Sequence, residues 1–249
     1  MDAEVRGEVL VRGFWLLALM ALLSSCDRFE EAGPLTTVEA RAELGGARSA
    51  RLSIDLPGGL LEVSGGGQAL VEASFRFDNE RLRPVLRRTM EGDRALVEIS
   101  APGYEAGLGR TRNEWALALS AAPPLDLELA MRAGRAELRL SGLPIRSLDL
   151  NLGAGELIVD LSGPPPSGAP GELTGQLEMG HGKLLLRLPG DAGLRVRAWK
   201  SVGTLEVAGL EQVPDDPGAW VNPGFAAAPR KIDLTARLGW GDLEIVVVD

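Results

Sequence analysis

The sequence predicts an all-β protein built as a stacked β-solenoid, a right-handed β-helix-like coil whose strands bend at glycine corners. A glycine corner followed by an alternating strand recurs in four stretches of the second half: 152–161, 179–188, 202–210 and 238–247. These copies lie about 20 to 36 residues apart, a spacing typical of solenoid repeats. Apolar and polar residues alternate on both sides of each corner, which is the period of a strand. Parallel strands joined by crossovers favour the right-handed coil.

The first residues of the chain resemble an export signal. The apolar run 15–23 has the length of a signal-peptide core, and it is shorter than the roughly 20 residues that a membrane span needs. Leu23, Ser24, Ser25 and Cys26 follow the bacterial lipobox pattern, in which the cysteine receives a diacylglycerol. Cys26 is the only cysteine in the chain. We therefore expect a signal peptide at 1–25, lipidation of Cys26 and a membrane-anchored lipoprotein of the cell envelope, in either membrane; the alternative is a chance apolar helix with a buried cysteine.

Residues 26–39 are polar and include Gly33 and Pro34, so we expect a short tether. Stretches 49–63, 69–77 and 94–100 alternate like strands, but their glycine corners are looser. Residues 40–110 are therefore predicted to be either a separate N-terminal β lobe or the first, irregular rungs. Residues 80–94 carry enough charge for a short helix, and Pro84 argues against a long one.

Residues 111–249 are predicted to form the main solenoid domain. Five stretches share one frame, at 125–140, 148–161, 173–188, 194–207 and 232–247. A corner with positive φ, or one in close contact with the next rung, tolerates glycine best. The predicted structural corner residues are Gly153, Gly155, Gly180, Gly182, Gly203, Gly239 and Gly241. Strands stacked about 4.8 Å apart would share backbone hydrogen bonds and bury a continuous aliphatic column.

Two inserts interrupt this frame. Residues 163–171 are rich in proline and glycine and should form an exposed loop. Residues 211–229 carry Trp220 and Phe225, which could cap the open end of the core or bind a partner. Trp199 and Trp240 adjoin corners, could share a face, and are further candidates for partner binding. The closing run 246–249 is apolar enough for an open edge strand.

The sequence offers little catalytic chemistry. His181 is the only histidine and lies between two corner glycines, so neither a metal site nor a catalytic triad has its other members nearby. The Gly-x-Gly phrases are followed by strands, whereas dinucleotide binding requires a helix there. We expect no cofactor and no metal. A formal net charge of −9 also argues against a nucleic-acid partner.

Carboxylates on outward positions raise the alternative of a polysaccharide-active β-helix enzyme. Basic side chains fall on the same face, as cross-strand pairing requires. We therefore expect no catalytic residues. The outward acids are Asp149, Glu156, Asp160, Glu178, Asp191, Glu206, Asp233, Asp242 and Glu244, and the outward bases are Arg139, Lys183, Arg187, Arg195, Arg197 and Arg237.

The succession of strand, Gly-x-Gly corner and aliphatic strand, with the closing stretch 222–247, resembles the bacterial toast-rack domain. That domain is related to the C-terminal region of LiaF-like envelope-stress proteins and to adhesin domains of the same β-solenoid shape. The likeness covers about 125–249, and an associated N-terminal toast-rack lobe would account for 40–110. The resemblance implies interaction without catalysis. LiaF-like proteins usually hold this domain on transmembrane helices, whereas this chain has a lipoprotein signal.

Together these observations predict a non-enzymatic envelope lipoprotein. Its rigid solenoid would present a surface to an envelope protein or a wall polymer, in an envelope-stress response. The alternatives are a structural adhesin that self-associates through the solenoid ends and, less favoured, the polysaccharide-active enzyme. The sequence leaves the oligomeric state open.

Overall fold

The computed structural model describes residues 33–101 and 111–248 of the chain. The predicted signal peptide and Cys26 lie outside these residues. The described part belongs to one compact unit. Within it, no helix is both long enough and apolar enough to cross a bilayer.

Nearly all of the regular structure is strand, in one sheet of 13 strands. The elements are β1 (Thr36–Ala42), β2 (Ser49–Gly65), β3 (Val71–Phe77), η1 (Glu80–Leu82), β4 (Val85–Glu91), β5 (Arg94–Ser100), β6 (Asn113–Leu119), β7 (Leu125–Arg139), β8 (Ile145–Asp160), β9 (Glu172–Pro189), β10 (Gly193–Ala208), β11 (Glu211–Val213), β12 (Asp216–Val221) and β13 (Lys231–Val248). The all-β solenoid class predicted from the sequence is confirmed.

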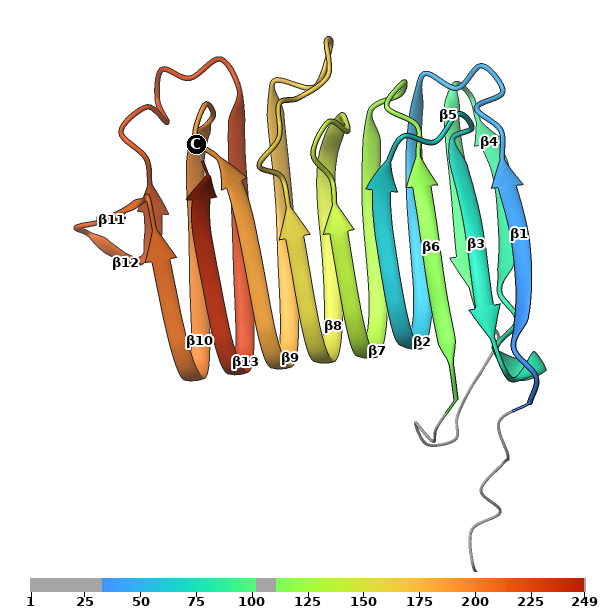
Figure 1. The fold of residues 1–249 in the computed structure, drawn as a ribbon. Coiled ribbons are helices and arrows are strands. Elements are labelled where there is room, and N and C mark those ends of the chain that lie inside the picture. Colours follow the sequence, from blue (N-terminus) through green and yellow to red (C-terminus); the bar gives the residue numbers. More distant parts are fainter. Residues whose placement is uncertain (1–32, 102–110, 249) are drawn as a thin grey trace, which may run out of the picture. The chain divides into compact units, whose positions relative to one another are not determined.

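Six long strands, β2, β7, β8, β9, β13 and β10, form the body of the sheet, and each bends at glycine into two legs (Figure 1). We call the residues before the corner the first leg and those after it the second leg. Equivalent legs of neighbouring strands are parallel and in register. The sheet therefore folds over itself, and the side chains between its two layers form the core.

The bends are aligned in a column of glycines with positive φ. Their φ angles lie between 116° and 131° at Gly59, Gly134, Gly155, Gly182, Gly203 and Gly241. An L-residue rarely adopts this conformation. A second set of corner glycines is needed for close approach instead. A Cβ at Gly153, Gly180 or Gly239 would lie 2.4 Å from a backbone carbonyl oxygen of the neighbouring strand.

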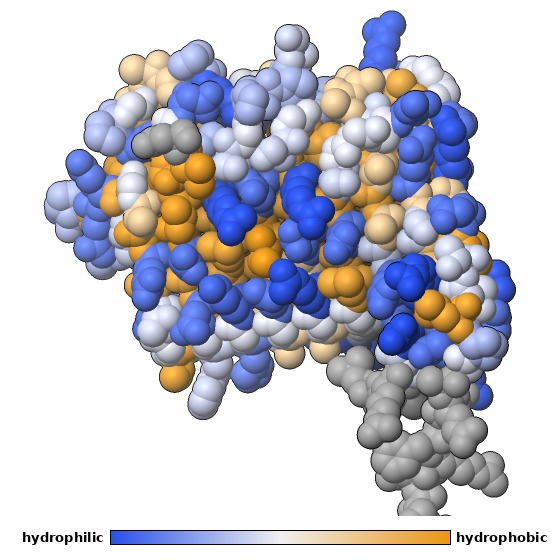
Figure 2. Space-filling model, in the orientation of Figure 1, coloured by the Kyte–Doolittle hydropathy of each residue, from blue (hydrophilic) through white to orange (hydrophobic). Residues whose placement is uncertain are grey.

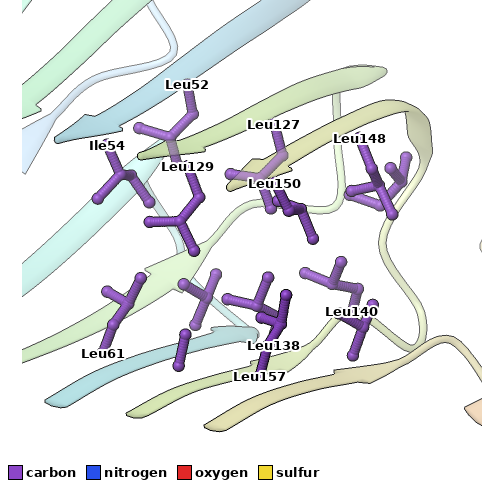
Figure 3. Close-up of a cluster of buried hydrophobic side chains, with 14 of the residues drawn as sticks. Leu52, Ile54, Leu61, Leu127, Leu129, Leu138, Leu140, Leu148, Leu150 and Leu157 are labelled. Carbon is purple, nitrogen blue, oxygen red and sulfur yellow. The ribbon is translucent and has the colours of Figure 1, made fainter. Parts of the chain in front are cut away.

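The core consists of aliphatic ladders that run along the stack. Leu52, Leu127 and Leu148 continue one another in the first legs, and Leu61, Leu138 and Leu157 face them from the second legs (Figure 3). All six are at most 2% exposed. On the face that Figure 2 shows, hydrophilic and hydrophobic side chains are mixed, with a broad hydrophobic area toward the β10 and β13 side. Alternation along each leg thus places one set of side chains inside and the other in solvent.

The order of the long strands differs from their order in the sequence. β13 lies between β9 and β10 and pairs with both in parallel. Val246, for example, is paired with Arg187 on one side and with Ala208 on the other. The prediction of an open edge strand at 246–249 is therefore wrong for Val246, whereas Val247 and Val248 pair with β9 alone and Asp249 lies outside the described residues. The open edge near this end belongs to β10.

The N-terminal strands extend both layers beyond β2. β5 and then β4 continue the first-leg layer, while β6, β3 and β1 continue the second-leg layer. β2 pairs with β5, β6 and β7, so hydrogen bonding is continuous between residues 40–110 and 111–249. β1 begins at Thr36, inside the predicted tether, because Val38 and Ala40 pack inward against β3. The expected short helix is a single 3-10 turn, η1, before Pro84.

The two predicted inserts behave differently. Residues 163–171 form a connection outside the strands. Residues 211–229 contain an antiparallel hairpin, β11 and β12, which the sequence pattern did not predict. β12 pairs with the first leg of β10 from Arg195 to Arg197, so it covers that leg's outer edge.

Candidate binding groove at the glycine corners

One row of outward side chains crosses four neighbouring strands just before their corners. The row contains Asn151 of β8, Glu178 of β9, Arg237 of β13 and Trp199 of β10, each aligned with the next in the strand register. The residue two positions further along each strand is Gly153, Gly180, Gly239 or Ser201. Three of these four positions have no side chain, so a hollow runs beside the row.

This hollow is an open groove with a volume of about 480 Å³. We call it the Trp199 groove. Its lining combines the row with the corner backbone and includes Asn151, Gly153, Glu178, Met179, Gly180, Trp199, Lys200, Ser201, Arg237, Leu238 and Gly239. The glycine floor is fixed by packing, because the adjacent carbonyl oxygens leave no room for Cβ atoms. The groove is therefore a consequence of how tightly the corners stack.

The side chains in the row are held by one another. Arg237 Nη1 donates to Glu178 Oε1 at 2.8 Å, and its guanidinium carbon lies 5.6 Å from the centroid of the Trp199 ring. The Trp199 indole also lies against Gly218 of β12, where a Cβ would be 2.7 Å from Nε1. Trp199 is nevertheless 42% exposed. An exposed indole beside an amide, a carboxylate and a guanidinium can offer apolar contact and hydrogen bonds at once.

Trp240 lies on the bend itself and does not line the groove. Its ring stacks on His181 of the adjacent strand, with centroids 6.1 Å apart and an interplanar angle of 30°. It is 58% exposed. His181 has no metal-ligand set around it: the described residues contain no group of three or more His, Cys, Asp or Glu that could hold an ion.

The other two predicted aromatics lie at the end of the stack. Trp220 of β12 is half-buried and packs against the core. Phe225, in the following turn, is half-buried between Arg195 and Lys231, whose cationic groups lie 4.8 and 5.6 Å from its ring centroid. The position of Trp220 is that of a cap on the core. Only Trp199, of the four aromatics, lines the groove.

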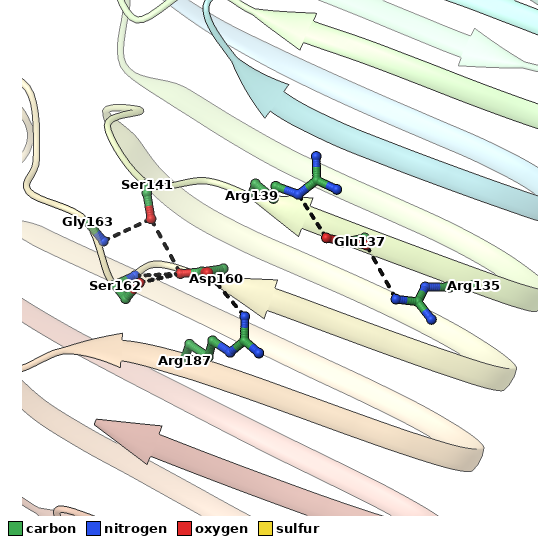
Figure 4. Close-up of polar contacts among 8 residues, drawn as sticks. All are labelled: Arg135, Glu137, Arg139, Ser141, Asp160, Ser162, Gly163 and Arg187. Atoms are coloured by element: carbon green, nitrogen blue, oxygen red, sulfur yellow. Dashed lines mark hydrogen bonds and ion pairs between the residues drawn. The ribbon is translucent and has the colours of Figure 1, made fainter. Parts of the chain in front are cut away.

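The outward carboxylates form many ion pairs across the strands. Figure 4 shows pairs of two kinds. Arg135 and Arg139 flank Glu137 along β7, whereas Arg187 of β9 approaches Asp160 of β8 at 3.6 Å, across the strands. Burial alone would raise the pKa of Asp160, but hydrogen bonds from Ser162 together with the charge of Arg187 hold that pKa below its ordinary value. Further pairs join Glu156 to Arg135, Glu244 to Lys183 and Asp233 to Arg195 and Arg197.

A second groove, of about 270 Å³, lies on the outer side of β2, β3 and β6. Its lining includes Glu39, Glu62, Glu72 and Arg139. Two of these carboxylates are engaged locally, since Glu39 accepts from Ser74 Oγ at 2.7 Å and Glu72 accepts from the Ala69 amide at 3.3 Å. The groove has no aromatic lining residue. The Trp199 groove therefore offers the more complete binding surface.

Sequence reasoning placed Glu178 and Arg237 among outward charges but did not connect them with Trp199, and it did not single out Asn151. The signal was present, because all four lie two residues before the first corner position of their rungs. Assembling the row required knowing that the rung 232–247 lies between the rungs 173–188 and 194–207 in the sheet. Without that order the row cannot be assembled.

The family model described as the N-terminal domain of toast_rack, DUF2154, matches residues 31–187. The match thus spans both the N-terminal strands and the first long rungs, whereas the sequence resemblance was placed mainly on 125–249. A comparison with curated proteins gives no match.

One solved structure shares the fold of this chain. A "putative cell adhesion protein" from Clostridium sporogenes ATCC 15579 has 23% sequence identity and a TM-score of 0.78, with 86% of this chain and 100% of that chain covered. A "putative adhesin" from Bacteroides fragilis NCTC 9343 has 6% identity, a TM-score of 0.30 and coverage of 85% and 97%. Another from Parabacteroides distasonis ATCC 8503 has 12% identity, a TM-score of 0.29 and coverage of 86% and 97%. The TM-score of the Clostridium sporogenes protein shows that it shares the fold of this chain, and a sequence identity of 23% shows the fold alone.

Proposed function

We propose that this chain, which belongs to the family of the N-terminal domain of toast_rack, is a non-enzymatic interaction protein of the bacterial cell envelope. The Trp199 groove is the observation that carries this proposal. It combines an exposed indole with fixed polar groups on a rigid sheet. The description of a structural neighbour as a "putative cell adhesion protein" supports an adhesive role.

The groove suits a ligand that is extended and polar. Its rim offers the Asn151 amide, the Glu178 carboxylate and the Arg237 guanidinium, while Trp199 offers an apolar ring. Hydroxyl and amide groups would bind the rim, and a flat apolar face would contact the indole. A wall polymer and an extended segment of an envelope protein both carry such groups. The experiment below separates them.

The proposed location rests on the sequence. Cys26 as the lipidated residue would place the protein at a membrane, and Thr36 at the start of β1 is ten residues further along the chain. Ten extended residues span at most about 35 Å. The start of β1 would therefore lie within that distance of the lipid-bearing residue. An envelope-stress role would follow if the partner in the groove is a stress sensor.

Catalysis receives less support. Several outward carboxylates are engaged in ion pairs with neighbouring strands, which favours a structural role for them. A polysaccharide-active enzyme would instead need carboxylates of different ionisation converging on one cleft.

The test is a binding assay with matched tryptophan variants. Trp199→Ala and Arg237→Ala should each weaken sedimentation of the purified chain with isolated wall polymer by about tenfold, the equivalent of roughly 1.4 kcal/mol. Trp240→Ala is the control, because it removes an exposed tryptophan outside the groove. Equal binding by all variants and the wild type would refute the groove as the wall-polymer site.

A photo-crosslinking residue in place of Asn151, used in living cells, tests the protein branch. A protein product that is lost with Trp199→Ala would identify an envelope partner. The same experiment with Cys26→Ala tests the anchor, because loss of the product together with loss of membrane association would show that lipidation brings the groove to its ligand. A product unchanged by Trp199→Ala, alongside unchanged wall binding, would end the proposal.

A further inference from the structure

The second leg of β10 is an open sheet edge. The first leg is covered by β12, but residues 204–208 pair with β13 alone among the described strands. Leu205 and Val207 point inward, in register with Leu243 and Ile245, yet both are only half-buried because no strand lies beyond them. An open edge of this kind presents free backbone groups to another strand.

This edge also carries an acid without a partner. Glu206 is exposed and has no ion pair or hydrogen bond within the part of the chain that the structure describes. Its cross-strand neighbour is Glu244, which is paired with Lys183 at 3.2 Å. Like charges opposite one another on a sheet are destabilising. A strand that docks here is favoured if it brings a cation beside Glu206.

The strand at the other end of the second-leg layer has the required features. Among the described strands β1 hydrogen-bonds to β3 alone, so its outer edge is also open there. Val38, Ala40 and Ala42 face inward along β1, whereas Glu39 and Arg41 face solvent. Arg41 is about half-exposed, at 51% of its side chain, although it reaches Glu43 and Glu72. β1 thus carries an accessible cation between two inward alanines.

The direction of β1 also fits. β6 is parallel to β2, β3 is antiparallel to β6, and β1 is antiparallel to β3. β1 therefore runs in the same direction as the second leg of β2, and the parallel ladder carries that direction through to β10. A second copy shifted along the stack would place its β1 beside β10 as one more parallel strand.

The two ends of the sheet have complementary steps. At the β10 end, the first-leg layer is longer, because β12 and β11 extend it (Figure 1). At the other end, the second-leg layer is longer, with three strands beyond β2 against two in the first-leg layer. The one-strand recess beside β4 would therefore accept β12 of the neighbouring copy, with the three-residue β11 turned out of the layer.

From these features we propose that copies of this chain associate head to tail, with β1 of one copy added to the second leg of β10 of the next. Glu206 lies beside Arg41 of the neighbouring copy, and Leu205 and Val207 lie beside Ala40 and Ala42. The contact joins two different surfaces, so it repeats into open-ended rows. It does not depend on the Trp199 groove and so goes beyond the proposed function.

The experiment is sedimentation velocity on the purified full chain over a range of concentrations. The wild type should form dimers and longer species as concentration rises. Glu206→Arg and Arg41→Glu should each weaken association by about tenfold or more, because each turns an attractive pair into a repulsive one. Both substitutions are at exposed side chains, and matching thermal unfolding midpoints would show that the fold is kept.

Sedimentation of an equal mixture of the two variants is the decisive measurement. The arginine introduced by Glu206→Arg in one copy would meet the glutamate introduced by Arg41→Glu in the next. The unchanged Glu206 of that second copy would in turn meet the unchanged Arg41 of the first variant, so the mixture should recover wild-type association. A misfolded variant cannot produce this recovery. A wild type that stays monomeric at all concentrations would overturn the proposal, and so would association that neither charge reversal changes.

Discussion

The carbonyl oxygen of Gly134 occupies the space that a Cβ of Gly155 would need, at a distance of only 1.8 Å. The same relationship repeats along the corner column, where Gly155 meets Gly182 at 1.9 Å. Each corner is thus closed by the next one. The tightness of the bend and the spacing of the strands are set by the same atoms.

Gly155→Ala should lower the free energy of unfolding by about 3 kcal/mol or more. A φ of 128° lies beyond the left-handed helical region and costs a side chain about 1–3 kcal/mol, and the overlap with Gly134 must also separate two strands. Urea denaturation measures the change. Gly66→Ala is the control, since its φ of 101° is also beyond the left-handed helical region but nothing lies within 4 Å of the added carbon. If the two variants cost the same, backbone strain and not corner packing would explain the glycines.

Asp126→Asn should destabilise the protein by about 2 kcal/mol at neutral pH. Asp126 is only 7% exposed and joins β7 to Arg94 of β5 and to Arg146 and Ser147 of β8. Glu137→Gln is the surface control, because Glu137 also pairs with arginines but lies on the solvent face. That change should cost less than about 1 kcal/mol.

The same carboxylate predicts a pH dependence. Burial alone would raise the pKa of Asp126, but hydrogen bonds from Arg146 and Ser147, with the charges of Arg146 and Arg94, hold that pKa below its ordinary value. Its contribution is therefore complete above the unfolded-state pKa of about 3.9 and is lost as the pH falls through the lower folded-state value. Unfolding free energies measured from pH 6 downward should fall less steeply below about pH 4 in Asp126→Asn than in the wild type. Parallel curves would contradict this assignment.

Leu150→Ala and Leu205→Ala make the same chemical change at the middle and at the open end of the stack. Leu150 is 0% exposed, so its loss should cost about 2–5 kcal/mol. Leu205 is half-buried because no described strand lies beyond β10 there. Truncating it should lower the free energy of unfolding by about 1 kcal/mol or less at low concentration. Denaturation of dilute samples provides the comparison. Equal costs would mean that the β10 end is covered in solution.

A chain that ends at Arg230 lacks β13 and should also lose the ordered structure of β10 and β12. β13 pairs with β9 and β10, so its removal leaves β10 with β12 as its only partner. Hydrogen exchange should show β10 and β12 unprotected in this variant, while β2, β7 and β8 remain protected. Protection of β10 in the shortened chain would show that β9 and β10 can pair directly.

The rungs could be predicted because each carries its own local signal. Glycine at 153 and 155 with alternation around it defines a bend and the inward face of Leu150 and Leu157, whatever lies next to it. Alternation does not specify neighbours. Rungs 194–207 and 232–247 share one corner frame, so either could follow 173–188, and the structure places the later one there. The pairing of short strands such as β11 with β12 depends on tertiary contact and leaves almost no periodic signal.

The groove shows the same limit. Trp199 was recognisable as an exposed aromatic candidate, but its neighbours Arg237 and Glu178 come from strands whose order was not predictable. Trp240 appeared equivalent to Trp199 because both adjoin corners. The structure separates them, with Trp240 on the bend against His181 and Trp199 in the row before it.

The insertion of β13 between β9 and β10 also sets an order of events in time. Residues 193–208 are synthesised before 231–248, yet their long neighbour in the sheet is the later segment. As the chain emerges, strands through β9 can stack on one another as they appear, but the final long neighbour of β10 has not yet been made. Until the later segment arrives, the edges of β9 and β10 that β13 will join are unpaired, and strand edges in this state are prone to aggregate. The interval between the synthesis of these two segments is therefore the stage at which these unpaired edges are most exposed to aggregation.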